Sequence, residues 1–448
     1  MKKDQWCSDQ REYVRRAYGS LPITFVRRVV FGQDPYWRRY FWSRWGWVPA
    51  EVRTAVSGGP VLWIDAISGG EVTQAVTFCK LLRAAVPTVR MLLCTNNRYS
   101  YDFAMNHLSV DAVMDSPWDC EGPVNRALNA IKPTAVIAVE NVSSPVLFCQ
   151  AHRRGITTML VSGLMSKGFD RHPMLRRTIE HPPFAILDAI GAKTDEDADG
   201  FVAFGADPSR VHLTGNMKFD ADYIAVSPDQ RLAWYQRVGL TPDHPMFLGA
   251  SLHPGEERLV GEAYLTVRQH WPQLELVLVP RYAAHIEQME QSVASLGVAT
   301  VRKTQLASRP RRAGEAVIVD TFGELSHLYA IATAAFLGGS AYLRNVVGLG
   351  QSIVEPLIHQ IPVFFGPYMN LWRDLTQELT SVWPNLQVTT PEALADGLCR
   401  LLQDPALVGR LRAKAAELVG QHQDDIAHNV EMVVNHLQAP QLAPAVPC

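Results

Sequence analysis

The 448-residue sequence lacks a long hydrophobic run and a strong net charge. No apolar stretch approaches the roughly 18 residues expected of a membrane-spanning helix, and we expect no signal peptide. The formal net charge is −2, so the charge balance gives no argument for binding nucleic acid. These absences predict a protein that is soluble or attached to the surface of a membrane.

The cysteines lack any pairing typical of a metal site, such as CxxC. Scattered cysteines of odd number indicate buried thiols in a reducing compartment. The seven are Cys7, Cys79, Cys94, Cys120, Cys149, Cys399 and Cys448. We therefore expect no metal site built from cysteines.

Two nucleotide-binding fingerprints are also missing. The sequence has no GxxxxGK[ST] loop, which disfavours a P-loop NTPase. The stretch "SGGE" (68–71) stands where a dinucleotide enzyme would carry GxGxxG after its first strand, which disfavours a dehydrogenase.

Residues 1–58 differ from the rest of the chain because they combine basic and aromatic side chains. This composition suits a membrane headgroup layer, where rings lie at the interface and cations meet anionic lipid. An arm packed on the body of the protein, with solvated arginines, is the alternative. The residues concerned are Arg15, Arg16, Arg27, Arg28, Tyr36, Trp37, Arg38, Arg39, Phe41, Trp42, Trp45 and Trp47.

From residue 59 the sequence alternates short apolar runs with stretches of helical periodicity, such as 71–86, 122–131 and 145–153. Continuous apolar strands alternating with helices predict a doubly wound parallel sheet. The expected strands of the first half are 61–67, 89–95, 111–116, 134–140, 157–163 and 187–194.

The alternation stops near 215–230 and then starts again. The expected strands of the second half are 246–252, 274–280, 315–321, 332–340, 361–367 and 386–390. We predict the class α/β, with two Rossmann-like domains facing a central cleft. Their expected bounds are 59–222 and 223–403, followed by a helical tail over 404–448.

Ligands of such folds bind outside the carboxyl ends of the strands, and polar residues recur there. Each has a structural alternative: an acidic residue in a first helical turn often only stabilises the helix dipole. Recurrence at the same end of successive strands favours a binding site. The residues are Glu71, Glu140, Ser251, His253, Arg281, Gly323, Glu324, Gly338, Gly339, Ser340 and Glu355.

Several stretches resemble the bacterial 3-deoxy-D-manno-octulosonic acid (Kdo) transferases, which are GT-B glycosyltransferases. "WIDAISGGE" (63–71) is similar to the family's "WIHAVSVGE", and "GADPSRVHLTGNMKFD" (205–220) to its "GAPPERVTVTGNLKFD". "IVDTFGELSHLYAIATAAFLGGS" (318–340) resembles "LGDTLGELGLLYALADVAFVGGS". The likeness spans about 61–380 in the family's order.

The sequence departs from the family pattern at several positions. Asp65 replaces a histidine, Val142 replaces the second carboxylate of "ETE", and Tyr282 replaces another histidine. Gln351 and Ser352 stand in place of "HN". These changes leave the identity of donor and acceptor open.

The resemblance implies a metal-independent, inverting transfer of Kdo from CMP-Kdo to a lipid A precursor. It makes Glu71 the general base and gives Glu140 and Lys218 transition-state roles. Ser251, His253 and Gln351 are expected to contact the donor. The implied nucleotide-binding residues are Pro280, Arg281, Phe322, Gly323, Glu324, Gly339, Ser340, Ser352, Ile353, Val354 and Glu355.

The resemblance also implies a nucleotide sugar and a lipid or glycan acceptor as partners, with no cofactor. We expect a cytoplasmic location; if the N-terminal arm is a membrane-surface element rather than a packed arm, the protein is also expected to bind the cytoplasmic face of the inner membrane. The alternatives are a GT-B transferase with another donor or a non-lipid acceptor, a nucleotide-sugar 2-epimerase, and a catalytically silent glycan- or lipid-binding relative.

Overall fold

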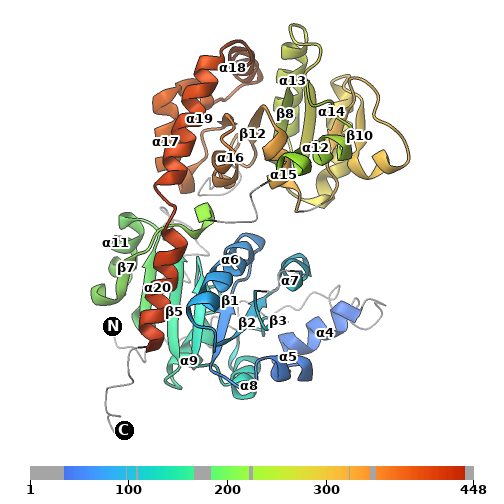
Figure 1. The fold of residues 1–448 in the computed structure, drawn as a ribbon. Helices are drawn as coiled ribbons and strands as arrows, with labels where there is room; N and C mark the ends of the chain where they lie inside the picture. The colour runs from blue at the N-terminus through green and yellow to red at the C-terminus, as the bar shows by residue number, and fades with distance from the viewer. Residues whose placement is uncertain are drawn as a thin grey trace. The chain divides into compact units, whose positions relative to one another are not determined.

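The structure, a computed structural model, describes residues 35–96, 98–106, 109–165, 183–220, 226–321, 323–343 and 350–438. The chain divides into two compact units (Figure 1). Unit 1 comprises residues 1–221 and 422–448, and unit 2 comprises residues 222–421. The part of the predicted arm that precedes residue 35 lies outside the described residues.

Unit 1 is built on a seven-stranded sheet in the described residues, with the order β3-β2-β1-β4-β5-β6-β7. All neighbouring strands are parallel. The central strands β1 and β4 are buried along their whole length because helices cover both faces of such a sheet, and their residues are apolar except for Asp65 at the end of β1. The strands are β1 (Val61–Asp65), β2 (Arg90–Thr95), β3 (Ala112–Asp115), β4 (Ala135–Val139), β5 (Thr157–Gly163), β6 (Ala189–Ala192) and β7 (Val211–Leu213).

Most helices of unit 1 connect successive strands, whereas α4 and α5 precede β1 and α20 follows unit 2; their apolar residues contribute to the cores on the sheet. They are α4 (Pro35–Arg44), α5 (Ala50–Ala55), α6 (Gly69–Ala85), α7 (Arg98–Met105), α8 (Glu121–Ile131), α9 (Pro145–His152), α11 (Asp195–Ala203) and α20 (Asp425–Gln438). Short 3₁₀ turns are η2 (Pro183–Ile186), η3 (Pro208–Arg210) and η4 (Met217–Asp220).

Helix α20 returns to unit 1 after the chain has completed unit 2 (Figure 1). Its apolar residues, among them Ile426, Val430 and Val433, join the core that packs on α6. The sequence predicts one helical tail over 404–448, but the structure divides that stretch between the two units at His422. The prediction fails because helical periodicity does not say which sheet a helix covers.

Unit 2 holds a second parallel sheet, with the order β10-β11-β9-β8-β12-β13 in the described residues. Its strands are β8 (Met246–Leu252), β9 (Glu275–Pro280), β10 (Thr300–Arg302), β11 (Ala316–Ile318), β12 (Ala334–Leu337) and β13 (Val363–Phe365). The predicted fold class, α/β with two Rossmann-like parallel-sheet domains, is therefore confirmed.

The α-helices of unit 2 are α12 (Pro228–Arg237), α13 (Glu256–Arg268), α14 (Ile286–Ser295), α15 (Leu325–Ile331), α16 (Val354–Ile358), α17 (Arg373–Val382), α18 (Pro391–Gln403) and α19 (Pro405–Gly420). Its 3₁₀ turns are η6 (Ala283–His285), η7 (Lys303–Ala307), η8 (Asn370–Trp372) and η9 (Pro384–Leu386).

Three details differ from the sequence prediction. The expected strand at 386–390 is absent from the described residues, where η9 and a single bridge between Phe365 and Gln387 stand instead. The edge strands β7 and β10 were not predicted, because each contains a polar residue and is partly exposed, so that neither forms a continuous apolar run. Among the free cysteines that the structure describes, Cys79 and Cys94 are buried as predicted, whereas Cys120 and Cys399 are partly exposed. Across the described residues, we find no helix that is both long enough and apolar enough to cross a membrane.

Candidate functional site

Glu71 lies in the first turn of α6, directly after β1. It forms a reciprocal capping box with Ser68: the Glu71 N–H donates to Ser68 Oγ at 3.3 Å, and the Ser68 N–H donates to Glu71 Oε2 at 2.9 Å. The Ile67 N–H donates to the same oxygen at 2.6 Å. Glu71 therefore fixes the start of α6, a structural role that its sequence position alone also suggests.

The Glu71 carboxyl is almost completely buried, with 6% of the residue exposed. Burial raises its pKa to about 7, against the opposing effect of the Ser68 N–H, and the negative charge of Glu140 adds to the rise. A carboxylate with a pKa near neutrality is suited to take a proton from a hydroxyl at physiological pH. The capping role and a role as base are compatible, since the cap uses Oε2.

Glu140 follows β4 and forms ion pairs with two lysines. Lys218 Nζ lies 2.8 Å from Glu140 Oε1, and Lys193 Nζ contacts the same oxygen. Burial raises the pKa of the Glu140 carboxyl, but the charges of Lys193 and Lys218 outweigh burial and hold the pKa below its usual value. Glu140 is therefore ionised, and this lysine–glutamate cluster (Glu140, Lys193 and Lys218) carries a net positive charge.

The two lysines differ in their surroundings. The Lys193 side chain is 4% exposed and the Lys218 side chain is 21% exposed. Lys193 follows β6 in "GAKTDED", and the sequence analysis did not single it out. A lysine directly after an apolar run was the available signal, because strand ends of a parallel sheet gather at one edge.

The segment that carries Lys218 is held by α20. The Asn216 N–H donates to Asp425 Oδ2 at 2.6 Å, and the Asn429 side chain bonds to both the Thr214 hydroxyl (2.9 Å) and the Thr214 carbonyl (3.0 Å). Gly215 has φ +79°, and a Cβ there would lie 2.1 Å from the Asp425 carboxyl. The "TGN" segment is thus shaped to fit α20, and α20 positions the turn that presents Lys218.

In unit 2, His253, Gln351 and Tyr282 lie close together at the carboxyl ends of the strands. Gln351 Nε2 is 3.3 Å from His253 Nε2, and the rings of His253 and Tyr282 meet edge to face at 5.5 Å. Ser251, at the end of β8, has φ +52°. The structure therefore brings the predicted donor contacts His253 and Gln351 together.

The backbone N–H groups of Gly339 and Ser340, expected to bind phosphate, already have a partner. They donate to the carboxylate of Glu256 at 2.7 and 3.1 Å, and the Ala341 N–H does so at 3.0 Å. Glu256 is fully buried and was not singled out from the sequence. A glutamate in the first turn of a helix was the signal, but its partners lie more than 80 residues away.

Glu324 is bound by two neighbours. Lys303 Nζ lies 2.7 Å from Glu324 Oε1, and the Thr321 hydroxyl donates to Glu324 Oε2 at 2.6 Å. Gly323 has φ +78°, a backbone conformation that favours glycine. Phe322 lies outside the described residues.

The remaining predicted nucleotide contacts fall into exposed and buried groups. Arg281 is exposed after β9, whereas Pro280 is buried. The side chains of Ile353 and Val354 are buried in the core, so only their backbone can face a ligand. Ser352 and Glu355 are partly exposed beside them. In the ranges that the structure describes, no group of three or more His, Cys, Asp or Glu residues could hold a metal ion.

Comparison with known proteins shows which family this chain resembles. The family model described as 3-deoxy-D-manno-octulosonic-acid transferase (kdotransferase) matches residues 39–221. A 3-deoxy-D-manno-octulosonic acid transferase of Chlamydophila psittaci is 24% identical, covering 81% of each chain. One of Bordetella pertussis is 25% identical, covering 83% of this chain and 85% of its own.

A solved structure shares the fold. The UDP-GlcNAc 2-epimerase of Neisseria meningitidis, bound to UDP-GlcNAc, superposes with a TM-score of 0.57 at 12% identity, covering 84% of this chain and all of the other. The family model matches only part of unit 1, whereas the two relatives, both named 3-deoxy-D-manno-octulosonic acid transferase, match 81% and 83% of this chain. The chain is thus similar to the Kdo transferases, a family of glycosyltransferases, over most of its length.

Proposed function

We propose that the protein transfers Kdo from CMP-Kdo to a hydroxyl of a lipid A precursor, with inversion and without a metal ion. The observation that carries the proposal is the buried Glu71 carboxyl, whose pKa is raised to about 7, in the same unit as the positively charged cluster around Glu140. The names of the relatives support the sugar that is transferred.

In the proposed reaction, Glu71 takes the proton of the acceptor hydroxyl. The hydroxyl oxygen forms a bond to the anomeric carbon of Kdo while the bond from that carbon to the phosphate oxygen of CMP breaks. CMP leaves with the electron pair of the broken bond, opposite the attacking oxygen, which inverts the configuration. Glu71 Oε2 accepts two backbone N–H groups, so it is held in one orientation for this transfer.

Lys218 and Glu140 are proposed to stabilise the transition state. Lys218 is the more exposed lysine of the cluster and can offer its positive charge to a developing negative charge. Glu140 holds Lys218 in place through an ion pair, with Oε1 of Glu140 2.8 Å from Nζ of Lys218. The buried Lys193 contacts the same oxygen and favours the ionised form of Glu140.

Unit 2 is proposed to bind the nucleotide at the carboxyl ends of its strands. Arg281, which is exposed, can neutralise the phosphate, and Glu355 can accept the two ribose hydroxyls. The N–H groups of Gly339 and Ser340 bind Glu256 in this structure, so they support the loop rather than the phosphate. Ser251, His253 and Gln351 are proposed to contact the Kdo group of the donor.

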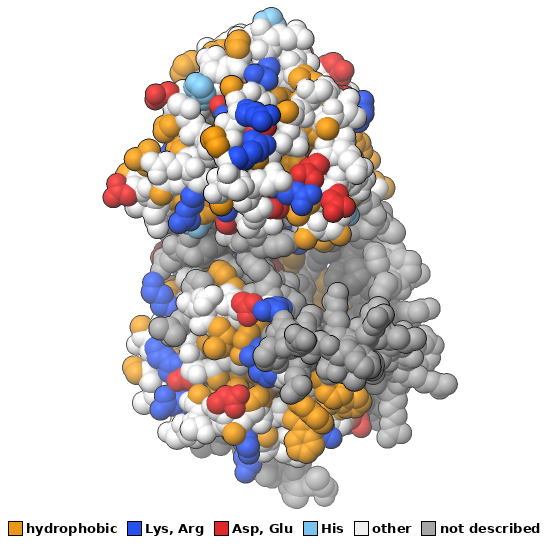
Figure 2. All heavy atoms as spheres, turned by 90° about the vertical axis from the view of Figure 1, so that its right-hand side faces the viewer, with side chains coloured by type: hydrophobic (Ala, Val, Ile, Leu, Met, Phe, Trp, Pro, Cys, Tyr) orange, Lys and Arg blue, Asp and Glu red, His pale blue; other side chains and the backbone are white. Residues whose placement is uncertain are grey.

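The N-terminal region is proposed to bind the membrane surface that holds the acceptor. Trp42, Trp45 and Trp47 are 53%, 39% and 55% exposed. Figure 2 shows groups of hydrophobic side chains on one side of unit 1. Arg126 lies over the Trp47 ring at 5.0 Å, a pairing of cation and aromatic ring suited to an anionic interface. The basic pairs Arg15/Arg16 and Arg27/Arg28 lie outside the described residues, whereas Arg39 lies in α4 with its guanidinium 3.8 Å from the centre of the Tyr101 ring.

Nucleotide selectivity tests the proposal. CMP should raise the melting temperature, because a ligand of the folded state stabilises it by mass action. UDP and ADP should not do so at equal concentration. Glu355→Ala should weaken the CMP effect more than Glu71→Ala does. Stabilisation by UDP or ADP in the absence of any CMP effect would refute the donor assignment.

A further inference from the structure

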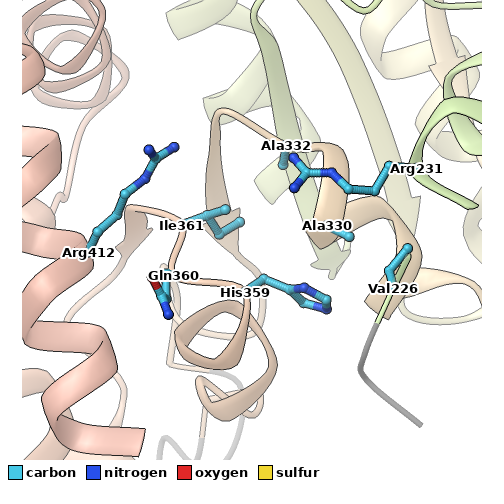
Figure 3. A pocket seen from close by; sticks show the side chains of 8 residues that line it. All are labelled: Val226, Arg231, Ala330, Ala332, His359, Gln360, Ile361 and Arg412. Carbon is cyan, nitrogen blue, oxygen red and sulfur yellow. The ribbon is translucent and has the colours of Figure 1, made fainter. Parts of the chain in front are cut away.

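Unit 2 contains a pocket of about 330 Å³ that the proposed transfer reaction does not use (Figure 3). Ala332 precedes β12 and Ile361 precedes β13, so the pocket lies at the amino ends of these strands. Gly339 and Ser340 follow β12 at its other end. The pocket is therefore at the edge of the sheet opposite the proposed nucleotide site.

Two arginines from different helices reach into this pocket. Arg231 comes from α12 and Arg412 from α19, and their side chains extend from opposite sides (Figure 3). Neither guanidinium has a hydrogen bond or ion pair with another side chain or carbonyl among the described residues. The lining residues that the structure describes include no acidic side chain. The pocket thus carries two positive charges without a counter-ion from its own lining.

His359 adds a neutral donor to the same pocket. Its Nε2 lies 3.1 Å from the Ser326 hydroxyl. In the tautomer whose Nε2 accepts the hydrogen bond of this hydroxyl, the neutral ring carries its proton on Nδ1. Burial lowers the pKa of His359 to about 4, and the charges of Arg231 and His327 add to this effect. At neutral pH the ring can thus donate one hydrogen bond without becoming charged.

We propose that this pocket, formed by Arg231, His359 and Arg412, binds a phosphate monoester. A phosphate offers three oxygens, enough for two guanidinium forks and the imidazole N–H, whereas a carboxylate offers two. The volume is at the lower end of the range for small-molecule sites, which suits a phosphate with a small organic group. Val226, Ala330, Ala332 and Ile361 supply an apolar wall for that group.

Binding of glycerol 3-phosphate to the full-length protein, measured by calorimetry at fixed ionic strength, tests the site. Vesicles containing phosphatidic acid test the lipid form of the same group, with phosphatidylcholine vesicles as the reference. We expect binding in at least one of these two arms. Arg231→Gln and Arg412→Gln should each raise Kd at least about tenfold, the effect of losing a charge-assisted hydrogen bond.

Two control variants show whether the phosphate binds in this pocket or elsewhere on the protein. Arg410→Gln removes an exposed charge from the same helix two residues away and should leave Kd unchanged. Arg281→Gln, at the proposed nucleotide site, should also leave it unchanged. The proposal is overturned by absence of binding in both arms, by wild-type affinity in Arg231→Gln and Arg412→Gln, or by an equal loss in either control.

Discussion

Lys193 forms an ion pair with Glu140 in which both side chains are buried. Glu140 lies at the end of β4 and Lys193 follows β6, so the pair joins two strand ends that are separated by β5. Lys218 shares the same Glu140 oxygen from a more exposed position. The buried pair therefore holds in place the carboxylate that binds Lys218, the more exposed lysine of the cluster and the one that can contact a substrate.

Lys193→Met should destabilise the protein and lower turnover. The change removes one partner of a buried carboxylate, but Lys218 remains, so we expect a loss of about 1–3 kcal/mol in the free energy of unfolding. Urea denaturation measures this loss. Lys80→Met, which changes an exposed lysine of α6, should shift stability by less than about 0.5 kcal/mol. Equal effects of the two variants would contradict the supporting role of Lys193.

The buried carboxyls of Asp65, Glu71 and Asp119 should each lower stability as the pH rises from about 5 to about 7, against the opposite contribution of His359, whose pKa burial lowers to about 4. Burial raises the pKa of Asp65 to about 6 and that of Glu71 and Asp119 to about 7. In this window each of these carboxyls binds more protons in the folded protein than in the unfolded chain, so its ionisation favours unfolding. Each carboxyl contributes a slope of up to about 1.4 kcal/mol per pH unit. Glu71→Gln should make the free energy of unfolding depend less on pH, and urea unfolding at pH 5, 6 and 7 measures this dependence. If the slope of stability against pH is the same as in the wild type, the raised pKa of Glu71 is refuted.

Asn429→Ala should lower both stability and turnover, although it lies far along the chain from Glu71 and Lys218. The change leaves the Ser162 N–H and the Thr214 hydroxyl without their buried acceptor, at a cost of about 1–3 kcal/mol. Thermal unfolding and transferase assays measure the two effects. Glu431→Ala, at an exposed position of the same helix, is the control. Normal turnover in a folded Asn429→Ala protein would show that α20 does not position Lys218.

Replacing Trp42, Trp45 and Trp47 together by alanine should weaken binding to anionic vesicles. These exposed rings are suited to the membrane interface, and basic residues of the arm add a salt-dependent attraction. Sedimentation with vesicles at low and high salt tests both contributions. Leu213→Ala and Leu232→Ala change exposed apolar residues elsewhere and should have no effect. Unchanged vesicle binding of the triple variant would favour an arm packed on the protein.

The parallel sheets could be predicted because their strands are continuous apolar runs with helices between them. The runs 61–67 and 246–252 coincide closely with β1 and β8. The place of α20 could not be predicted, because its amphipathic pattern fits either sheet. Contacts such as Asn429 to Ser162, 267 residues apart, decide it.

The candidate site could be predicted where residues follow strands directly, as Glu71 and Glu140 do. The same rule could have found Lys193, which also follows a strand. The role of Glu256 could not be predicted, because the three N–H groups that it binds come from a distant loop. Sequence reasoning assigned two of these N–H groups to phosphate because glycine-rich turns often expose such donors.

The turnover of Glu71→Gln tests the central claim most directly. Glutamine preserves the capping box, since its side-chain oxygen can accept the Ser68 N–H, and it removes the basic carboxylate. Glu121→Gln, in the first turn of α8, measures the effect of a helix-dipole charge alone and should leave turnover intact. With Kdo transfer from CMP-Kdo as the assay, we predict that kcat of Glu71→Gln falls roughly a hundredfold or more while stabilisation by CMP persists. A kcat close to that of the wild type would contradict the assignment of Glu71 as the base.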